Sequence, residues 1–136
     1  MSMDRRRLTG SWLAAGFAGA LLVPLAAPAQ AAEVDLEAQM RSTAAFPNAR
    51  GHAEYESDSN GREFEISVAG VRALAGHRLI VRVHGDFVGR MTVGSLGRAH
   101  LDRHSGVPRM AAGTVVRVRT GSGRLVTYGT LHRDLD

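Results

Sequence analysis

Two histidines and an aspartate alternate within the stretch AHLDRHSG, residues 99–106. His100, Asp102 and His104 stand two residues apart, and imidazoles with a carboxylate are the groups that zinc sites and proton-transfer sites use. Successive side chains of a β-strand point to opposite faces, so His100 and Asp102 would share the solvent face. His104 would lie at the end of this strand or in the following loop. The spacing therefore allows either a metal site or the ordinary polar face of a strand.

Two observations weigh against a metal at this position. Metal-binding imidazoles usually need a hydrogen-bond partner that fixes the ring, and an exposed strand face supplies few such partners. Arg98 and Arg103 flank the group and would repel a cation. We therefore expect a polar strand face, with a metal-dependent site at His100, Asp102 and His104 as the alternative.

The strands that must position these residues include a hairpin centred on Asn60 and Gly61. Asn-Gly is a strong signal for a type I′ turn, which needs positive φ at both central residues. With these two residues as the loop, the apolar residues of the flanking segments fall on one face, so the register is self-consistent. The expected pairs are Ala53 with Val68, Tyr55 with Ile66, and Ser57 with Phe64.

The same register gathers carboxylates on the outer face of this hairpin. Glu56 falls opposite Glu65 and Asp58 opposite Glu63, with Glu54 nearby. Like charges directly opposite one another destabilise a sheet by a few tenths to about 1 kcal/mol. We therefore expect this acidic face to be offset by arginines of a neighbouring strand, by a bound cation or by a basic partner.

Arginines accumulate in the second half of the chain. Residues 66–133 contain eleven arginines and two acidic residues, whereas residues 33–65 contain eight acidic residues and three arginines, and lysine is absent. A hairpin about Gly121 and Ser122 is predicted to pair Val118 with Leu125 and Val116 with Thr127. It would point Arg117 and Arg119 outward, with Arg124 opposite Arg119.

This charge layout has two interpretations. We expect the acidic and basic hairpins to be neighbours in one sheet and to neutralise each other through individually weak ion pairs. The alternative is a bipolar surface, which could join copies head to tail or bind a polyanionic polymer of the cell envelope.

Apolar and polar residues alternate with a period of two from residue 61 to 131, between turn signals about ten residues apart, which is typical of short antiparallel strands. Another hairpin, with His84, Gly85 and Asp86 as its loop, would pair Val83 with Phe87, Val81 with Gly89, and Leu79 with Met91. We predict an all-β fold, an antiparallel β-sandwich or small barrel of about seven to eight strands. Residues 43–133 would form the single domain, and residues 32–42 a first strand or a leader.

The first 31 residues have the pattern of a secretory signal peptide. A basic start, MSMDRRRLTG, precedes an apolar run that Pro24 interrupts, and Ala29 to Ala31 fit the small-x-small rule for cleavage. Arg5 and Arg6 would permit the twin-arginine route as well as the general one. We predict a secreted or envelope-associated protein, in contact with the membrane only through this segment before cleavage. The chain contains no cysteine, so packing and hydrogen bonds alone must stabilise the exported domain.

Enzyme motifs are missing from the sequence. It contains no HExxH motif and no phosphate-binding loop, and Ser95 lacks the glycine and the strand–turn–helix context of a nucleophile elbow. Most aromatic residues beyond residue 31 are expected to point inward, which argues against stacking platforms for sugars or single-stranded nucleic acid. We predict no enzymatic activity, no cofactor and no specific nucleic-acid partner.

The segments GHAEYES, VRVHGDFVG and GVPRMAAGTVVRVRTGSGRLVTYGTL are similar to small bacterial secreted β-domains of unknown function. The first half also faintly resembles the chordin-type (CHRD) domain, another extracellular β-module. These resemblances imply an exported β fold and bring no catalytic residue.

The sequence as a whole predicts an exported non-catalytic module that binds an envelope protein or a polyanion. Its binding residues would be Arg117, Arg119 and Arg124, and a metal-binding protein or a self-associating, homo-oligomeric envelope protein are the alternatives. The residues of the predicted acidic face are Glu54, Glu56, Glu63 and Glu65.

Overall fold

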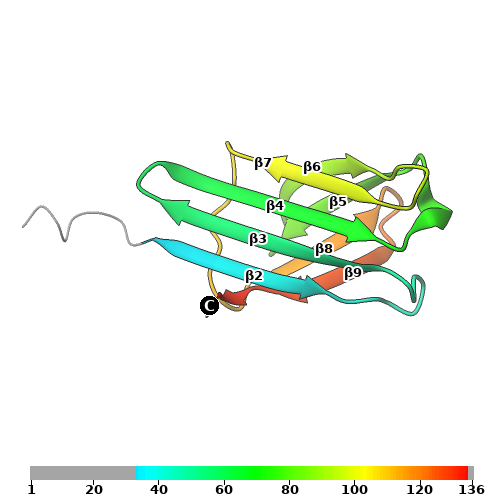
Figure 1. Cartoon of the computed structure of the whole chain (residues 1–136), viewed down its shortest axis with the longest axis horizontal. Coiled ribbons are helices and arrows are strands. Elements are labelled where there is room, and N and C mark those ends of the chain that lie inside the picture. The colour runs from blue at the N-terminus through cyan, green and yellow to red at the C-terminus, as the bar shows by residue number, and fades with distance from the viewer. Residues whose placement is uncertain (1–32, 135–136) are drawn as a thin grey trace, which may run out of the picture. The chain divides into compact units, whose positions relative to one another are not determined.

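Apolar side chains alternate with polar ones along every long strand, and the apolar set forms one core between two sheets. The structure is a computed structural model that describes residues 33–134, so the predicted signal peptide lies outside the described residues. The chain folds into an antiparallel β-sandwich, which confirms the predicted fold class and excludes the closed barrel (Figure 1).

Nine strands and one short 3₁₀ helix, η2 (Arg72–Leu74), make up the described part of the chain. The strands are β2 (Val34–Met40), β3 (Arg50–Asp58), β4 (Gly61–Ala69), β5 (Arg78–Val83), β6 (Asp86–Thr92), β7 (Ala99–Arg103), β8 (Val115–Thr120), β9 (Leu125–Thr130) and β10 (His132–Arg133). The expected first strand is β2, while the two-residue β10 was not predicted. Among residues 33–134 there is no helix of the length and apolarity needed to span a membrane.

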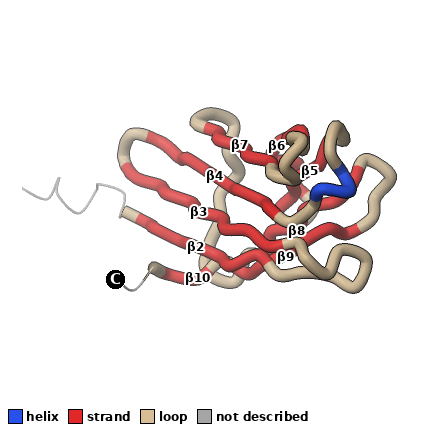
Figure 2. The backbone as a smooth tube through the Cα atoms, turned by 45° about the vertical axis from the view of Figure 1, so that its right-hand side comes forward, coloured by secondary structure: helices blue, strands red, loops and turns tan. Residues whose placement is uncertain are grey.

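One sheet has five strands in the order β10-β2-β3-β4-β7, and the other has four in the order β6-β5-β8-β9. The two layers of strands are visible in Figure 2. The acidic hairpin β3–β4 belongs to the five-stranded sheet and the basic hairpin β8–β9 to the four-stranded sheet. The expectation that they neutralise each other within one sheet is therefore wrong.

The β3–β4 hairpin keeps the predicted faces but not the predicted register. Tyr55 pairs with Phe64, and the loop consists of Ser59 and Asn60. The side chain of Asp58 accepts a hydrogen bond from the backbone N–H of Asn60 at 2.7 Å. This local bond turns the chain one residue earlier than a type I′ turn at Asn60 and Gly61 would.

A β-bulge between Val81 and Arg82 changes the β5–β6 hairpin near its tip. The pairs Leu79–Met91 and Val81–Gly89 are as predicted, but Val83 pairs with Asp86 instead of Phe87. The extra residue lies on β6 and changes which side chains beyond it point outward. Phe87 therefore faces solvent and is 42% exposed. Its predicted inward position is wrong.

The β8–β9 hairpin has a longer loop than predicted. Val118 pairs with Thr127 and Val116 with Gly129, and a bulge follows Val118. Thr120 closes the loop, because its backbone N–H donates to the carbonyl of Arg124 at 2.9 Å. Arg124 therefore lies in the loop and does not oppose Arg119.

Candidate binding faces of the two sheets

The outer face of the five-stranded sheet carries carboxylates in rows that cross the strands. In one row Asp35, Glu56 and Glu63 are direct neighbours on β2, β3 and β4. In the next row the neighbours are Glu37, Glu54, Glu65 and Asp102. We call these seven residues the acidic face. It includes all four acidic residues singled out from the sequence.

The cross-strand pairs within the acidic face differ from those expected. Glu56 lies opposite Glu63 and Glu54 opposite Glu65, while Asp58 pairs with Gly61 at the hairpin end. The register shift by two residues explains the change, since it preserves the face of each side chain and replaces its partner. The crowding of like charges remains, with other partners.

Histidines, rather than arginines of a neighbouring strand, contact these carboxylates. Apart from the contacts of Asp134, every ion pair in the described part of the chain joins an imidazole to a carboxylate. The contacts are His52 with Glu54 (3.0 Å) and Glu37 (3.7 Å), His100 with Glu65 (3.4 Å), and His104 with Asp102 (3.2 Å) and Glu63 (3.7 Å).

Glu56 is the carboxylate most affected by this arrangement. Burial raises the pKa of its carboxyl above the ordinary value of 4.5, and the negative charges of Asp35, Glu63 and Glu54 raise it further. Among residues 33–134 no imidazole contacts Glu56; the histidines contact its neighbours in the rows instead. Its ionised form is therefore disfavoured in the folded protein.

Replacing Glu56 with glutamine should stabilise the protein at pH 7 by a few tenths to about 1 kcal/mol, since it removes the like charge opposite Glu63. The raised folded-state pKa of Glu56 means that its contribution to stability falls as the pH rises above 4.5. Urea denaturation should show the advantage of the E56Q variant at pH 7 and its loss near pH 3. Asp86→Asn, which removes a charge from the other sheet, is the control. A variant no more stable than wild type at pH 7 would contradict the prediction.

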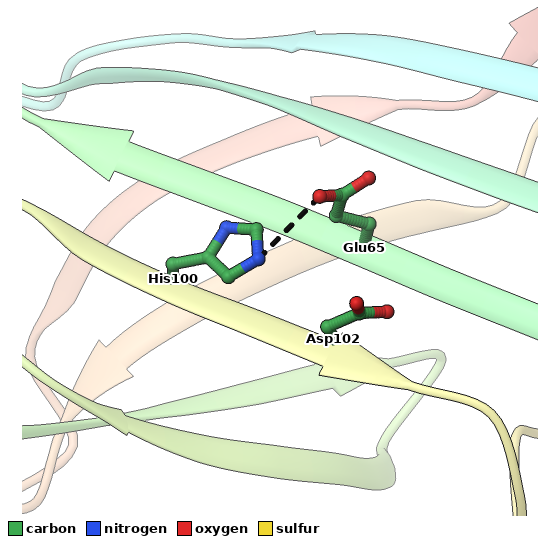
Figure 3. Close-up of side chains that lie close together, drawn as sticks. All are labelled: Glu65, His100 and Asp102. Carbon is green, nitrogen blue, oxygen red and sulfur yellow. Dashed lines mark ion pairs between the residues drawn. The ribbon is translucent and has the colours of Figure 1, made fainter.

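Glu65, His100 and Asp102 come together as a cluster on the acidic face (Figure 3). One ligand atom from each residue lies within 4.8 Å of the others. Ser67, next to His100 across the β4–β7 ladder, has its Oγ at 3.1 Å from the Nδ1 of His100. This contact supplies the ring partner that sequence reasoning expected to be missing.

The cluster differs from the trio singled out by spacing. His104 contacts Asp102 and Glu63 but is not part of it, and Glu65 of β4 takes its place. The guanidinium of Arg103 donates to the backbone carbonyls of Val88 (2.9 Å) and Ser105 (3.1 Å) and keeps its charge, so the expected repulsion of a cation stays a prediction. Glu65 escaped prediction because no local signal in the sequence specifies that β4 pairs with β7.

The outer face of the four-stranded sheet carries arginines. Two rows cross the strands β6, β5, β8 and β9. The first consists of Phe87, Arg82, Arg117 and Tyr128, and the second of Arg90, Ile80, Arg119 and Leu125. Arg78 extends the group along β5, opposite Thr92. We call Arg78, Arg82, Arg90, Arg117 and Arg119, with Phe87 and Tyr128, the arginine face.

The guanidinium groups of the arginine face form no ion pair with a carboxylate among residues 33–134. Arg82 and Arg119 donate to carbonyls of their own hairpin loops, at 3.2 Å to Gly85 and 3.1 Å to Gly123. Their charges are therefore available to a negatively charged partner.

Two aromatic rings border these arginines. Phe87 is 42% and Tyr128 38% exposed, at the two ends of the first row. The guanidinium carbon of Arg90 lies 4.9 Å from the centre of the Phe87 ring, and that of Arg82 lies 5.8 Å from it. The predicted inward position is wrong for Phe87, whereas the predicted pairing of Val116 with Thr127 already leaves the next residue, Tyr128, on the outer face.

Arg124 does not belong to the arginine face. Its guanidinium carbon lies 5.8 Å from the centre of the Phe46 ring, at the end of the sandwich. Of the three arginines singled out from the sequence, Arg117 and Arg119 are thus brought together and Arg124 is separate. Arg78, Arg82 and Arg90 were missed because they lie on the β5–β6 hairpin, and the pairing of β5 with β8 is not encoded locally.

No protein-family model and no curated protein sequence matches the chain. The functions proposed below therefore rest on the geometry and charge of the two faces.

Proposed function

We propose that this protein is an exported, non-catalytic module that binds a polyanionic polymer through its arginine face. The observation that carries the proposal is a group of five outward arginines, none ion-paired within residues 33–134, on adjacent strands of one sheet. The basic and apolar pattern of the first 31 residues supports export.

The arrangement suits a polymer with repeated phosphate or carboxylate groups. A guanidinium binds such groups through two parallel hydrogen bonds, and Arg82 and Arg117 are cross-strand neighbours about 4.8 Å apart at the backbone. Cross-strand like charges are unfavourable without a partner, so an anion that bridges them would also relieve the sheet. Phe87 and Tyr128 bound the row and offer apolar contact to the backbone of a polymer.

The test measures the binding of long-chain polyphosphate by isothermal titration calorimetry at several salt concentrations. Replacing Arg82 and Arg117 with glutamine should weaken binding at low salt at least roughly tenfold. The slope of log K against log salt should fall by about two, one for each lost phosphate contact. The matched control replaces the exposed Arg109 and Arg133, which removes the same charge elsewhere.

Equal losses in the two double variants would show dependence on net charge alone and would overturn the proposal. Sedimentation under the same conditions tests the alternative that the arginine face binds a second copy of the chain. Concentration-dependent mass that disappears in the R82Q/R117Q variant, without polyphosphate binding by the wild type, would replace the polymer with a self-association interface.

A divalent cation site is a second candidate function, which we propose for the cluster of Glu65, His100 and Asp102. The observation that favours it is the convergence of one imidazole and two carboxylates, with Ser67 orienting the ring. Zinc accepts this set of ligands. A cation there would also offset the row of four carboxylates that Glu65 and Asp102 complete.

Zinc titration of protein dialysed against a chelator should show one bound equivalent. His100→Ala should abolish this binding and Glu65→Gln should weaken it at least tenfold, whereas His132→Ala, on β10, should leave it intact. Less than one equivalent in the wild type, or equal binding in the H100A variant, would exclude the site.

A further inference from the structure

A hollow of about 720 Å³ opens on the five-stranded sheet beyond the acidic rows. Ser67 and Ala69 of β4 form part of its lining, together with Gly51 of β3. Their small side chains leave the space open. Gly51 cannot take a larger residue, because a Cβ atom there would lie 2.2 Å from the carbonyl oxygen of Ser67. The volume lies in the range of sites that bind small molecules.

Cationic and titratable side chains surround this hollow. Arg50 and His52 contribute from β3, while Arg98 and His100 contribute from the start of β7 and the residue before it. The lining contains no carboxylate. The charge of the sheet therefore reverses along β3 and β4, from the rows of glutamates to a group of arginines.

The two arginines have little to bind within the described part of the chain. Among residues 33–134 the guanidinium of Arg50 donates one long hydrogen bond, 3.5 Å to the carbonyl of Asn48. Arg98 forms no side-chain hydrogen bond or ion pair there. Both imidazoles, by contrast, contact carboxylates of the acidic face, His52 with Glu54 and His100 with Glu65.

A second hollow of about 690 Å³ shares Arg50, Ala69 and Arg98 with the first. It extends over the apolar side chains of Phe46 and Leu96, the latter 65% exposed. Arg72 and Arg124 line it as well, so Arg124, separate from the arginine face, lies here. Cationic groups thus stand at the junction of the two hollows, with an apolar surface beside them.

We propose that the joined hollows bind a small organic phosphate, whose phosphate group lies between Arg50 and Arg98 and whose apolar body covers Phe46 and Leu96. Two guanidiniums provide the paired donors that a phosphate accepts, and their charge is complementary to it. The apolar body gains from leaving water against Phe46 and Leu96. The two arginines that would hold the phosphate, Arg50 and Arg98, are not part of the arginine face, so the site does not depend on the function proposed for that face.

The experiment uses 1-naphthyl phosphate as the probe. Calorimetry measures its affinity for residues 32–136, which are the whole chain after removal of the predicted signal peptide. Inorganic phosphate and 1-naphthol should each bind at least tenfold more weakly, since each lacks one half of the ligand. Equal affinity for either of these compounds would overturn the proposal. Backbone amide NMR should show the largest shifts at Ser67, Ala69 and Arg98.

Two variants test the location of the site. Arg98→Gln should weaken 1-naphthyl phosphate at least tenfold by removing a phosphate contact, and Ala69→Leu should do so by filling the hollow at unchanged charge. Arg117→Gln, on the arginine face, is the control and should bind as the wild type does. If the A69L variant fails to fold, the R98Q variant still decides the question. Wild-type affinity in the R98Q variant, or an equal loss in the R117Q variant, would overturn the assignment.

Discussion

Replacing Phe64 with alanine should lower the free energy of unfolding by about 3–5 kcal/mol, the range expected for a fully buried phenylalanine. Phe64 is 0% exposed and lies on β4, paired with Tyr55 on one side and Arg103 on the other. Its loss would leave a cavity beneath the strand that carries Glu63 and Glu65. Each kcal/mol lost should lower the melting temperature by roughly 4–8 °C for a domain of this size.

Phe87→Ala is the matched control, because it deletes the same side chain from a position that is 42% exposed. It should cost less than about 1 kcal/mol. In polyphosphate binding, the F87A variant should bind more weakly than the wild type, because Phe87 borders the arginine face. The F64A variant should bind as the wild type does, because Phe64 does not border that face. Thermal denaturation and calorimetry on the same samples separate the two effects. Similar losses of stability in the two variants would contradict the assignment of Phe64 to the core.

The inward and outward faces of most strands could be predicted from the sequence, because alternation is a local property of the chain. Val81, Phe64 and Val118 were expected in the core, and all three are 0% exposed. The assignment of side chains to the inner or outer face stays correct when the predicted register is shifted by an even number of residues. For this reason Glu54, Glu56, Glu63 and Glu65 were placed on one outer face although their partners were wrong.

Turn geometry limited the prediction of register. At β3–β4, the short hydrogen bond from the Asn60 N–H to the Asp58 side chain starts the turn early. At β5–β6, a single bulge moves Phe87 from the core to the surface. Both effects involve one residue or one bond. They are too small to change the hydrophobic pattern from which the hairpins were predicted.

Pairing between distant strands could not be predicted at all, and the candidate sites depend on it. The metal cluster needs β4 beside β7, and the arginine face needs β5 beside β8. Which hairpin joins which sheet follows from packing of the whole core, for which a local pattern contains no information. The separation of acidic and basic hairpins into different sheets is the clearest example, since the charges alone favoured neighbours.

Gly70 should be the glycine whose replacement has the largest effect on both stability and the proposed phosphate site. It follows β4 with a φ of +78°, a left-handed conformation that costs an alanine roughly 1–2 kcal/mol. A Cβ atom at Gly70 would also lie 2.0 Å from the carbonyl oxygen of Asn48. That contact forces the backbone to move and should add roughly 1–3 kcal/mol of strain.

Gly76→Ala separates these two costs. Gly76 has a similar φ of +85°, but a Cβ atom there would have no neighbour within 4 Å. Urea denaturation should therefore show a loss of roughly 1–2 kcal/mol for the G76A variant and a clearly larger loss for the G70A variant. Equal losses would mean that the approach of Asn48 to Gly70 has no energetic consequence.

The same pair of variants connects the turn after β4 to the phosphate site. Within residues 33–134, the backbone carbonyl of Asn48 accepts the one hydrogen bond of the Arg50 guanidinium, and a Cβ atom at Gly70 would lie 2.9 Å from that guanidinium. Displacing Asn48 should therefore displace Arg50 as well. We expect the G70A variant, assayed below its unfolding transition, to bind 1-naphthyl phosphate several-fold more weakly than the G76A variant. If the two bind equally, the position of Arg50 is set by β3 alone and not by the contact of its loop with Gly70.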